Sequence, residues 1–159
     1  MKVPFLDLQA QYQSIKPEVD SAIQAVLESS AYSGGPFVAE FEEAFARYCG
    51  TDHCIGLNSG TAALALLLQA HDIGPGDEVI TAANSFFASA EAISEVGATP
   101  VLVDCEEDTA LMDPMLLERA ITPRTKAIIP VHLYGQCADI DAILAIARPK
   151  NILVFEDAC

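Results

Sequence analysis

Residues 78–104 read EVITAANSFFASAEAISEVGATPVLVD. The apolar runs Glu78–Ala82 and Pro100–Asp104 have the length typical of buried strands, and residues 87–96 between them have the pattern of a short helix. Strand, helix and strand in this order predict two parallel strands joined by a helical crossover.

The same alternation continues on both sides of this stretch. Three further apolar runs are expected as strands, namely His53–Leu57, Lys126–Leu133 and Ile152–Glu156, and helices are expected at 61–71, 114–121 and 139–147. Asp113 and Asp139 are typical residues for the start of a helix. Apolar strands separated by helices predict an α/β fold, a three-layer α/β/α arrangement with a mostly parallel sheet covered on both faces. In such sheets ligands bind at the carboxyl ends of the strands.

The first fifty residues have a different pattern. Apolar residues at helical spacing predict one helix with Pro17 in its first turn, namely Ile15, Val19, Ile23 and Val26. A second helix carries an aromatic stripe that favours core or interface packing and is closed by Gly50: Phe37, Phe41, Phe45 and Tyr48. We therefore expect an N-terminal helical segment, 1–50, and a larger domain, 51–159.

Composition excludes several classes of protein. Of the 159 residues 52% are hydrophobic and 19% charged, which excludes intrinsic disorder. The net charge of −15 disfavours binding to nucleic acid or an anionic membrane surface. No apolar run approaches ~18 residues, so we expect no transmembrane helix. The first residues, Met1–Asp7, lack a signal-peptide pattern, and we expect a cytoplasmic protein.

The cysteines form an odd set without a CxxC pair: Cys49, Cys54, Cys105, Cys137 and Cys159. This favours reduced thiols that are buried or half-buried. The pair His53-Cys54 alone does not make a zinc site, and no metal site is expected.

Small residues follow the first apolar run. Ser59, Gly60 and Thr61 precede a helix, where free backbone N–H groups and the helix dipole can bind a phosphate. The same residues also suit an ordinary helix cap, and these residues alone leave both interpretations open.

Aromatic, acidic and imidazole groups stand at the other strand ends. Phe86 follows the second run and could stack on a planar ligand, or lie with Phe87 in the core. Asp157 follows Glu156 at the end of the fifth run, where a carboxylate needs a partner such as a cationic ring nitrogen, a metal or a helix end. His132 suits a structural role better than a catalytic one.

Taken in order, these motifs resemble the DegT/StrS family of pyridoxal-phosphate-dependent nucleotide-sugar aminotransferases. The resemblance spans essentially the whole chain and rests on these segments: Val3-Pro4-Phe5-Leu6-Asp7-Leu8, Gly35-Pro36 with Phe41–Phe45, Asn58–Leu64, Gly74–Ile80, Ile121–Ile128, Pro130–Gln136 and Glu156-Asp157-Ala158. It implies the PLP-dependent transferase fold of type I, of which this chain would be an incomplete N-terminal portion of the large domain.

The resemblance also implies roles for individual residues. Gly60 and Thr61 would hold the phosphate of pyridoxal 5'-phosphate, with Ser59 close by. Phe86 would stack on the pyridine ring, and Asp157 would pair with the pyridine nitrogen. A carboxylate there keeps the nitrogen protonated, which makes the ring an electron sink.

The family's catalytic lysine, which forms the Schiff base with the cofactor, lies beyond the segment that matches this chain. The resemblance therefore covers about the N-terminal two-fifths of such an enzyme, and no lysine here is a candidate: Lys2, Lys16, Lys126 or Lys150. Two strands of the family's sheet would also be missing beside the first run. We therefore expect the isolated chain to be poorly soluble or to depend on a partner.

The resemblance implies an aminotransferase that moves an amino group from an amino acid, with glutamate expected, to a nucleotide-linked keto-sugar. Family members are homodimers, so a homodimer is expected. Two alternatives stay open. One is a sugar dehydratase of the family, which carries histidine in place of the lysine; the other is a truncated chain without catalytic activity.

Overall fold

The computed structural model describes residues 3–159, so Lys2 lies outside the described residues. The chain divides into two compact units, one that ends at Gly56 and one that spans Leu57–Cys159. No helix among the described residues is long and apolar enough to cross a membrane.

The first unit contains helices α1 (Leu8–Ser29) and α2 (Pro36–Cys49). Asp7 begins α1, since its carboxylate accepts the Ala10 amide at 2.9 Å. Pro17 therefore lies inside the helix, and its expected place in the first turn is wrong. The proline removes one backbone hydrogen bond, and on a helix without buried residues water can satisfy the carbonyl that is left.

The aromatic stripe lies on α2, and Gly50 ends this helix as predicted, with φ of 68°. The rings of Phe41 and Phe45 stack with centroids 5.4 Å apart, and Tyr48 follows at 6.2 Å. These three rings are exposed. Among residues 3–159 they pack on one another along the helix and do not enter a core.

The second unit contains one parallel sheet with the strand order β2-β1-β3-β4. Its strands are β1 (Glu78–Ala82), β2 (Thr99–Val103), β3 (Thr125–Ile129) and β4 (Leu153–Val154). Its helices are α3 (Gly60–Ala70), α4 (Phe87–Glu95), α5 (Pro114–Ala120) and α6 (Ile140–Ala147), with short 3₁₀ turns η1 (Leu133–Gly135) and η2 (Arg148–Lys150). Asp113 and Asp139 cap α5 and α6, as predicted.

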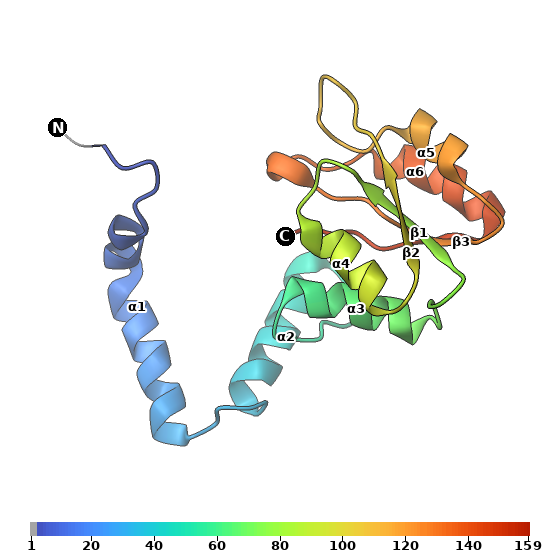
Figure 1. Cartoon of the computed structure of the whole chain (residues 1–159). Helices are drawn as coiled ribbons and strands as arrows, with labels where there is room; N and C mark the ends of the chain where they lie inside the picture. The colour runs from blue at the N-terminus through green and yellow to red at the C-terminus, as the bar shows by residue number, and fades with distance from the viewer. Residues whose placement is uncertain (1–2) are drawn as a thin grey trace. The chain divides into compact units, whose positions relative to one another are not determined.

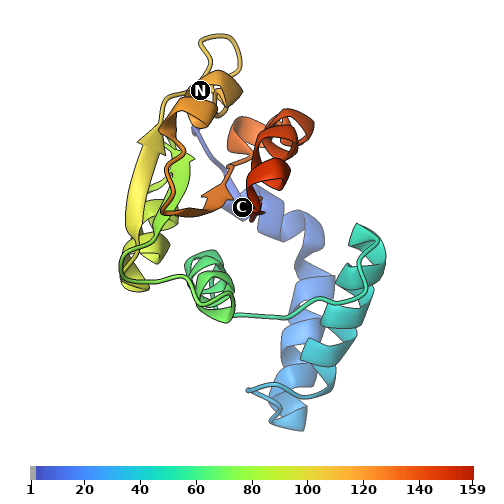
Figure 2. The ribbon, with the colours of Figure 1, turned by 90° about the vertical axis from the view of Figure 1, so that its right-hand side faces the viewer.

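Helices cover both faces of the sheet, which confirms the three-layer α/β/α prediction (Figures 1 and 2). Neighbouring strand residues enter opposite cores: Val79 packs with α3 and α4, and Ile80 packs with α5 and α6. Side chains of successive strand residues alternate between faces, so a strand buried on both faces is apolar throughout.

One predicted strand is absent, two end earlier than predicted, and the strand expected at Pro100–Asp104 is Thr99–Val103. Residues 53–57 form no strand, and Ile55 is 77% exposed, because nothing in the described chain pairs with them. The third strand ends at Ile129, since Pro130 has no N–H for the ladder. The last strand is only Leu153–Val154, although a single bridge between Val131 and Asp157 extends its pairing to the site.

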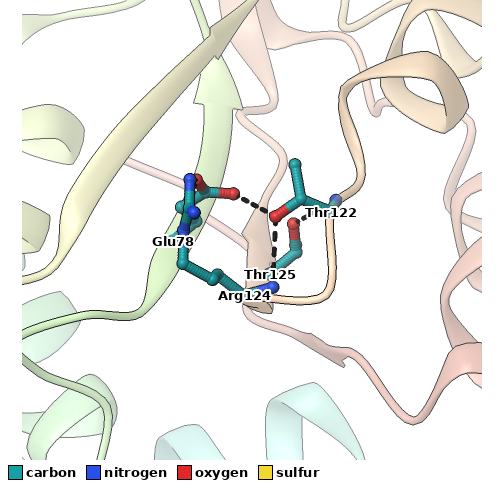
Figure 3. A network of polar contacts seen from close by, with 4 residues as sticks. All are labelled: Glu78, Thr122, Arg124 and Thr125. Atoms are coloured by element: carbon teal, nitrogen blue, oxygen red, sulfur yellow. Dashed lines mark hydrogen bonds and ion pairs between the residues drawn. The ribbon is translucent and has the colours of Figure 1, made fainter.

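A polar network joins the amino end of β1 to the turn before β3 (Figure 3). Glu78 is 6% exposed. Its carboxylate accepts the Thr122 hydroxyl at 2.5 Å and the Arg124 Nε at 3.0 Å, and it also pairs with the Arg124 guanidinium. The Thr122 hydrogen bond and then Arg124 hold the pKa of Glu78 below its ordinary value.

We expect Glu78→Gln to lower the free energy of unfolding at neutral pH. A carboxylate with a lowered pKa stabilises the fold above its ordinary pKa, and this contribution is lost as the pH falls through the lowered value. The difference between the wild type and Glu78→Gln should therefore be largest near about pH 7 and shrink toward about pH 3. Urea unfolding across this range measures it, with the exposed Glu91→Gln as control. A difference that stays constant with pH would contradict the assignment.

Candidate functional site

A pocket of about 750 Å³ lies at the carboxyl ends of the strands in the second unit. Four segments line it: the start of α3, the loop after β1, the loop after β3 and the chain after β4. This is the edge at which the sequence predicts the ligand.

Four of the five predicted site residues line this one pocket, namely Gly60, Thr61, Phe86 and Asp157. They come from three separate segments, and the fold brings them together. Ser59 is not part of the lining; it lies directly before α3 as its N-cap.

The start of α3 has a serine cap and two backbone N–H groups without an acceptor. Ser59 Oγ accepts the Ala62 amide at 3.1 Å, so the cap interpretation of Ser59 is correct. The amides of Gly60 and Thr61 have no acceptor within the described residues. A Cβ on Gly60 would lie 2.7 Å from the Cys159 sulfur, so a larger residue there would displace the Cys159 side chain.

Asp157 is held by both its backbone and its carboxylate. Its amide donates to Pro130 O at 2.9 Å, and its carbonyl accepts the His132 amide at 3.0 Å. Its Oδ2 accepts the Ser89 hydroxyl at 2.8 Å, and its Oδ1 accepts the Cys159 amide at 3.4 Å. The acidic end of this strand therefore has partners, as its cost in an apolar setting requires.

His132 links the loop after β3 to the end of β4. Its Nδ1 accepts the Ala138 amide at 3.1 Å, which leaves the proton of the neutral ring on Nε2. Nε2 lies 2.8 Å from Glu156 Oε2. Both ring nitrogens are thus occupied by the protein, and these contacts favour the structural role over a catalytic one.

The aromatic rings after β1 do not lie in the core, so that interpretation is wrong. Phe86 is 80% exposed and lines the pocket, and Phe87 is exposed without lining it. The backbone turns from β1 into α4 at this point, which leaves both rings outside the packed layers. Ser85 also lines the pocket, and its buried Oγ has no hydrogen-bond partner within the described residues.

Sequence reasoning assigned no role to Ser85 and Ser89. A serine in the apolar stretch of a helix is the signal that could have singled out Ser89. The cysteines also differ from expectation: all five are free, but Cys49, Cys137 and Cys159 are exposed, since they lie at a helix end and in loops. Cys137 and Cys159 line the pocket.

Within residues 3–159 no group of three or more His, Cys, Asp or Glu side chains is placed to hold a metal ion. No lysine is part of the described pocket lining. Lys126 lies in β3 at the opposite end of the sheet, beside a smaller hollow that also includes Asp77 and Asn151.

Comparison with known proteins gives a consistent set of relatives. The profile of the DegT/DnrJ/EryC1/StrS aminotransferase family matches residues 13–159. A dTDP-3-amino-3,4,6-trideoxy-alpha-D-glucose transaminase of Streptomyces venezuelae is 51% identical over 99% of this chain. A UDP-2-acetamido-2-deoxy-3-oxo-D-glucuronate aminotransferase of Pseudomonas aeruginosa is 51% identical over 98%. The chain spans 41% and 44% of the lengths of these two relatives.

Solved structures agree with the fold. DesV of S. venezuelae, solved in complex with a ketimine intermediate, superposes with a TM-score of 0.96 at 51% identity, over 99% of this chain and 42% of DesV. NtdA of Bacillus subtilis, solved with bound cofactor PMP, gives 0.95 at 38% identity, over 99% of this chain and 37% of NtdA. The expected type I fold is thereby confirmed for this N-terminal portion, and the chain belongs to the DegT/DnrJ/EryC1/StrS aminotransferase family.

Proposed function

We propose that the protein containing this chain is a pyridoxal-phosphate-dependent aminotransferase, and that this chain forms the N-terminal part of its cofactor site. One observation carries the proposal: Gly60, Thr61, Phe86 and Asp157 come from separate segments and line a single pocket. Because the chain spans about two-fifths of the relatives named above, the activity is proposed for the whole protein.

The residues of the pocket suit this cofactor. The unpaired amides at the start of α3 match a phosphate. The buried Ser85 hydroxyl lacks a partner and can donate to a polar group of a ligand. Asp157 supplies a carboxylate to the same lining. The lining therefore offers donors for an anionic group and an acceptor for a cationic nitrogen.

When bound, pyridoxal phosphate supplies an electron-accepting ring for amino transfer. The chain's own residues have simpler tasks. Gly60 and Thr61 bind the phosphate through backbone N–H groups and the helix dipole. Phe86 provides an aromatic face for the ring. Asp157 holds a proton on the ring nitrogen, because an opposite charge nearby favours the protonated form.

The substrates proposed are an amino acid, with glutamate expected, and a nucleotide-linked keto-sugar. The names of the two relatives, one a transaminase of a dTDP-sugar and one an aminotransferase of a UDP-sugar, support this substrate class. We further propose a cytoplasmic homodimer, in which residues 1–50 form a helical segment and residues 51–159 form part of a cofactor-binding domain.

Release of 2-oxoglutarate from glutamate by the whole protein, loaded with pyridoxal phosphate, tests the activity. We expect stoichiometric release without the sugar and turnover when a nucleotide-linked keto-sugar is added. A sugar that loses water while no 2-oxoglutarate forms would instead indicate the dehydratase.

We expect the 159-residue chain alone to gain no site-specific covalent label when it is mixed with pyridoxal phosphate and reduced with borohydride. No lysine is part of the described pocket lining, so the cofactor carbonyl has no amine beside it there. Peptide mass mapping measures the label, with the whole protein as positive control. A label confined to Lys126 or Lys150 would contradict the proposed site.

A further inference from the structure

Ser89 is a buried polar residue on an otherwise apolar helix face. It is 1% exposed, and the other buried residues of α4 are Ala88, Ala92 and Ile93. A hydroxyl buried among such neighbours costs free energy unless it is hydrogen-bonded. Its Oγ donates to Asp157 Oδ2 at 2.8 Å, across 68 residues of sequence. Ser89 therefore donates its hydrogen bond to a residue of the pocket lining.

Two hydrogen bonds among the described residues reach the carboxylate of Asp157, and Ser89 donates one of them. The backbone of Asp157 is fixed by hydrogen bonds to Pro130 and His132 in the segment after β3. On the side chain, the only other protein donor among the described residues is the Cys159 amide, at the long distance of 3.4 Å. Ser89 thus makes the stronger of the two contacts that orient the carboxylate.

We propose that Ser89 is a positioning residue, which orients the carboxylate of Asp157 toward the ring nitrogen of the cofactor. The inference rests on the proposed function, since that function supplies the cationic partner. A hydroxyl that donates to a carboxylate makes a charge-assisted hydrogen bond, which is stronger than one between neutral groups. Ser89 acts through Asp157 and lies outside the pocket lining.

The test compares three variants of the whole protein. Ser89→Ala removes the donor, and Ser89→Cys keeps the volume while offering only a weak S–H donor. Ser94→Ala is the matched control, because Ser94 is an exposed serine of the same helix whose Oγ donates to Ala90 O. Two quantities are measured: the dissociation constant of pyridoxal phosphate, and the ¹⁵N shift of its labelled ring nitrogen as a function of pH.

We expect Ser89→Ala and Ser89→Cys to weaken cofactor binding about tenfold, the scale of one lost hydrogen bond to a charged group. Both should also let the ring nitrogen lose its proton at lower pH than in the wild type, and Ser94→Ala should change neither quantity. In an Asp157→Asn background, Ser89→Ala should have no further effect on the nitrogen, because the residue through which it acts is gone.

Three results would overturn the inference. If Ser89→Cys bound pyridoxal phosphate as tightly as the wild type, with the same nitrogen titration, side-chain volume would matter and the hydrogen-bond donor would not. An unchanged nitrogen titration in Ser89→Ala, or an undiminished effect in the Asp157→Asn background, would exclude action through Asp157. A wild-type protein that does not bind pyridoxal phosphate would instead refute the proposed function, and the role of Ser89 toward the cofactor with it.

Discussion

Asp157→Asn is expected to lower the turnover of the whole protein by about a hundredfold or more, the scale seen when one preorganised electrostatic group is removed from an active site. An asparagine amide carries no charge and cannot keep the ring nitrogen protonated. The phosphate contacts of Gly60 and Thr61 are untouched, so cofactor affinity should fall much less than turnover.

Steady-state assays and cofactor titration on the same preparations separate these two effects. Asp141→Asn is the control, since it removes one carboxylate from the exposed side of α6, away from the pocket. Equal turnover in Asp157→Asn and Asp141→Asn would remove Asp157 from the proposed chemistry. A loss of affinity as large as the loss of turnover would show that Asp157 mainly binds the cofactor.

The second large effect concerns stability. Leu68→Ala should destabilise the second unit by about 3 kcal/mol, within the range for leucine side chains deleted from a core. Leu68 is fully buried on α3 and packs with Val79, Ile93 and Ile129. Deleting it leaves a cavity between α3 and the sheet. Because α3 also carries Gly60 and Thr61, cofactor binding should weaken as well.

Leu66→Ala provides a matched comparison on the same helix. Leu66 is 47% exposed, so the change should stay within about 0.5–1 kcal/mol. Urea unfolding followed by circular dichroism measures both variants. An equal loss of unfolding free energy in Leu66→Ala and Leu68→Ala would contradict the orientation of α3 on the sheet.

Local sequence signals predicted most of the second unit. The run Glu78–Ala82 became β1 with the expected bounds, and Asp113 and Asp139 begin their helices. These features depend on residues close in sequence: turn and cap chemistry, and apolar runs that only a doubly covered sheet can bury. The strand predicted at residues 53–57 is absent, because a strand needs a neighbouring strand and apolar composition alone does not supply one.

For the candidate site, the sequence likewise indicated some features and left others to the tertiary structure. Family motifs in the sequence singled out Gly60, Thr61, Phe86 and Asp157, and each stands at the end of a predicted strand or the start of a helix. The sequence left two roles open for Ser59, a helix cap and a phosphate contact. Only the structure shows that its Oγ accepts a hydrogen bond from the Ala62 amide. For Phe86 the residues alone left both core and pocket open, and the turn into α4 decides between them.

The sequence by itself determined the α/β class, the parallel order of strand and helix, and the family, because periodicity and ordered motifs are local properties of the chain. Only the tertiary structure decided that Ser89 meets Asp157, that His132 is held between Ala138 and Glu156, and that Glu78 is locked to Arg124. These pairs are far apart in sequence or depend on side-chain orientation. Ser89 and Glu78 are buried, so packing removes their polar groups from water and makes hydrogen bonds to these partners necessary.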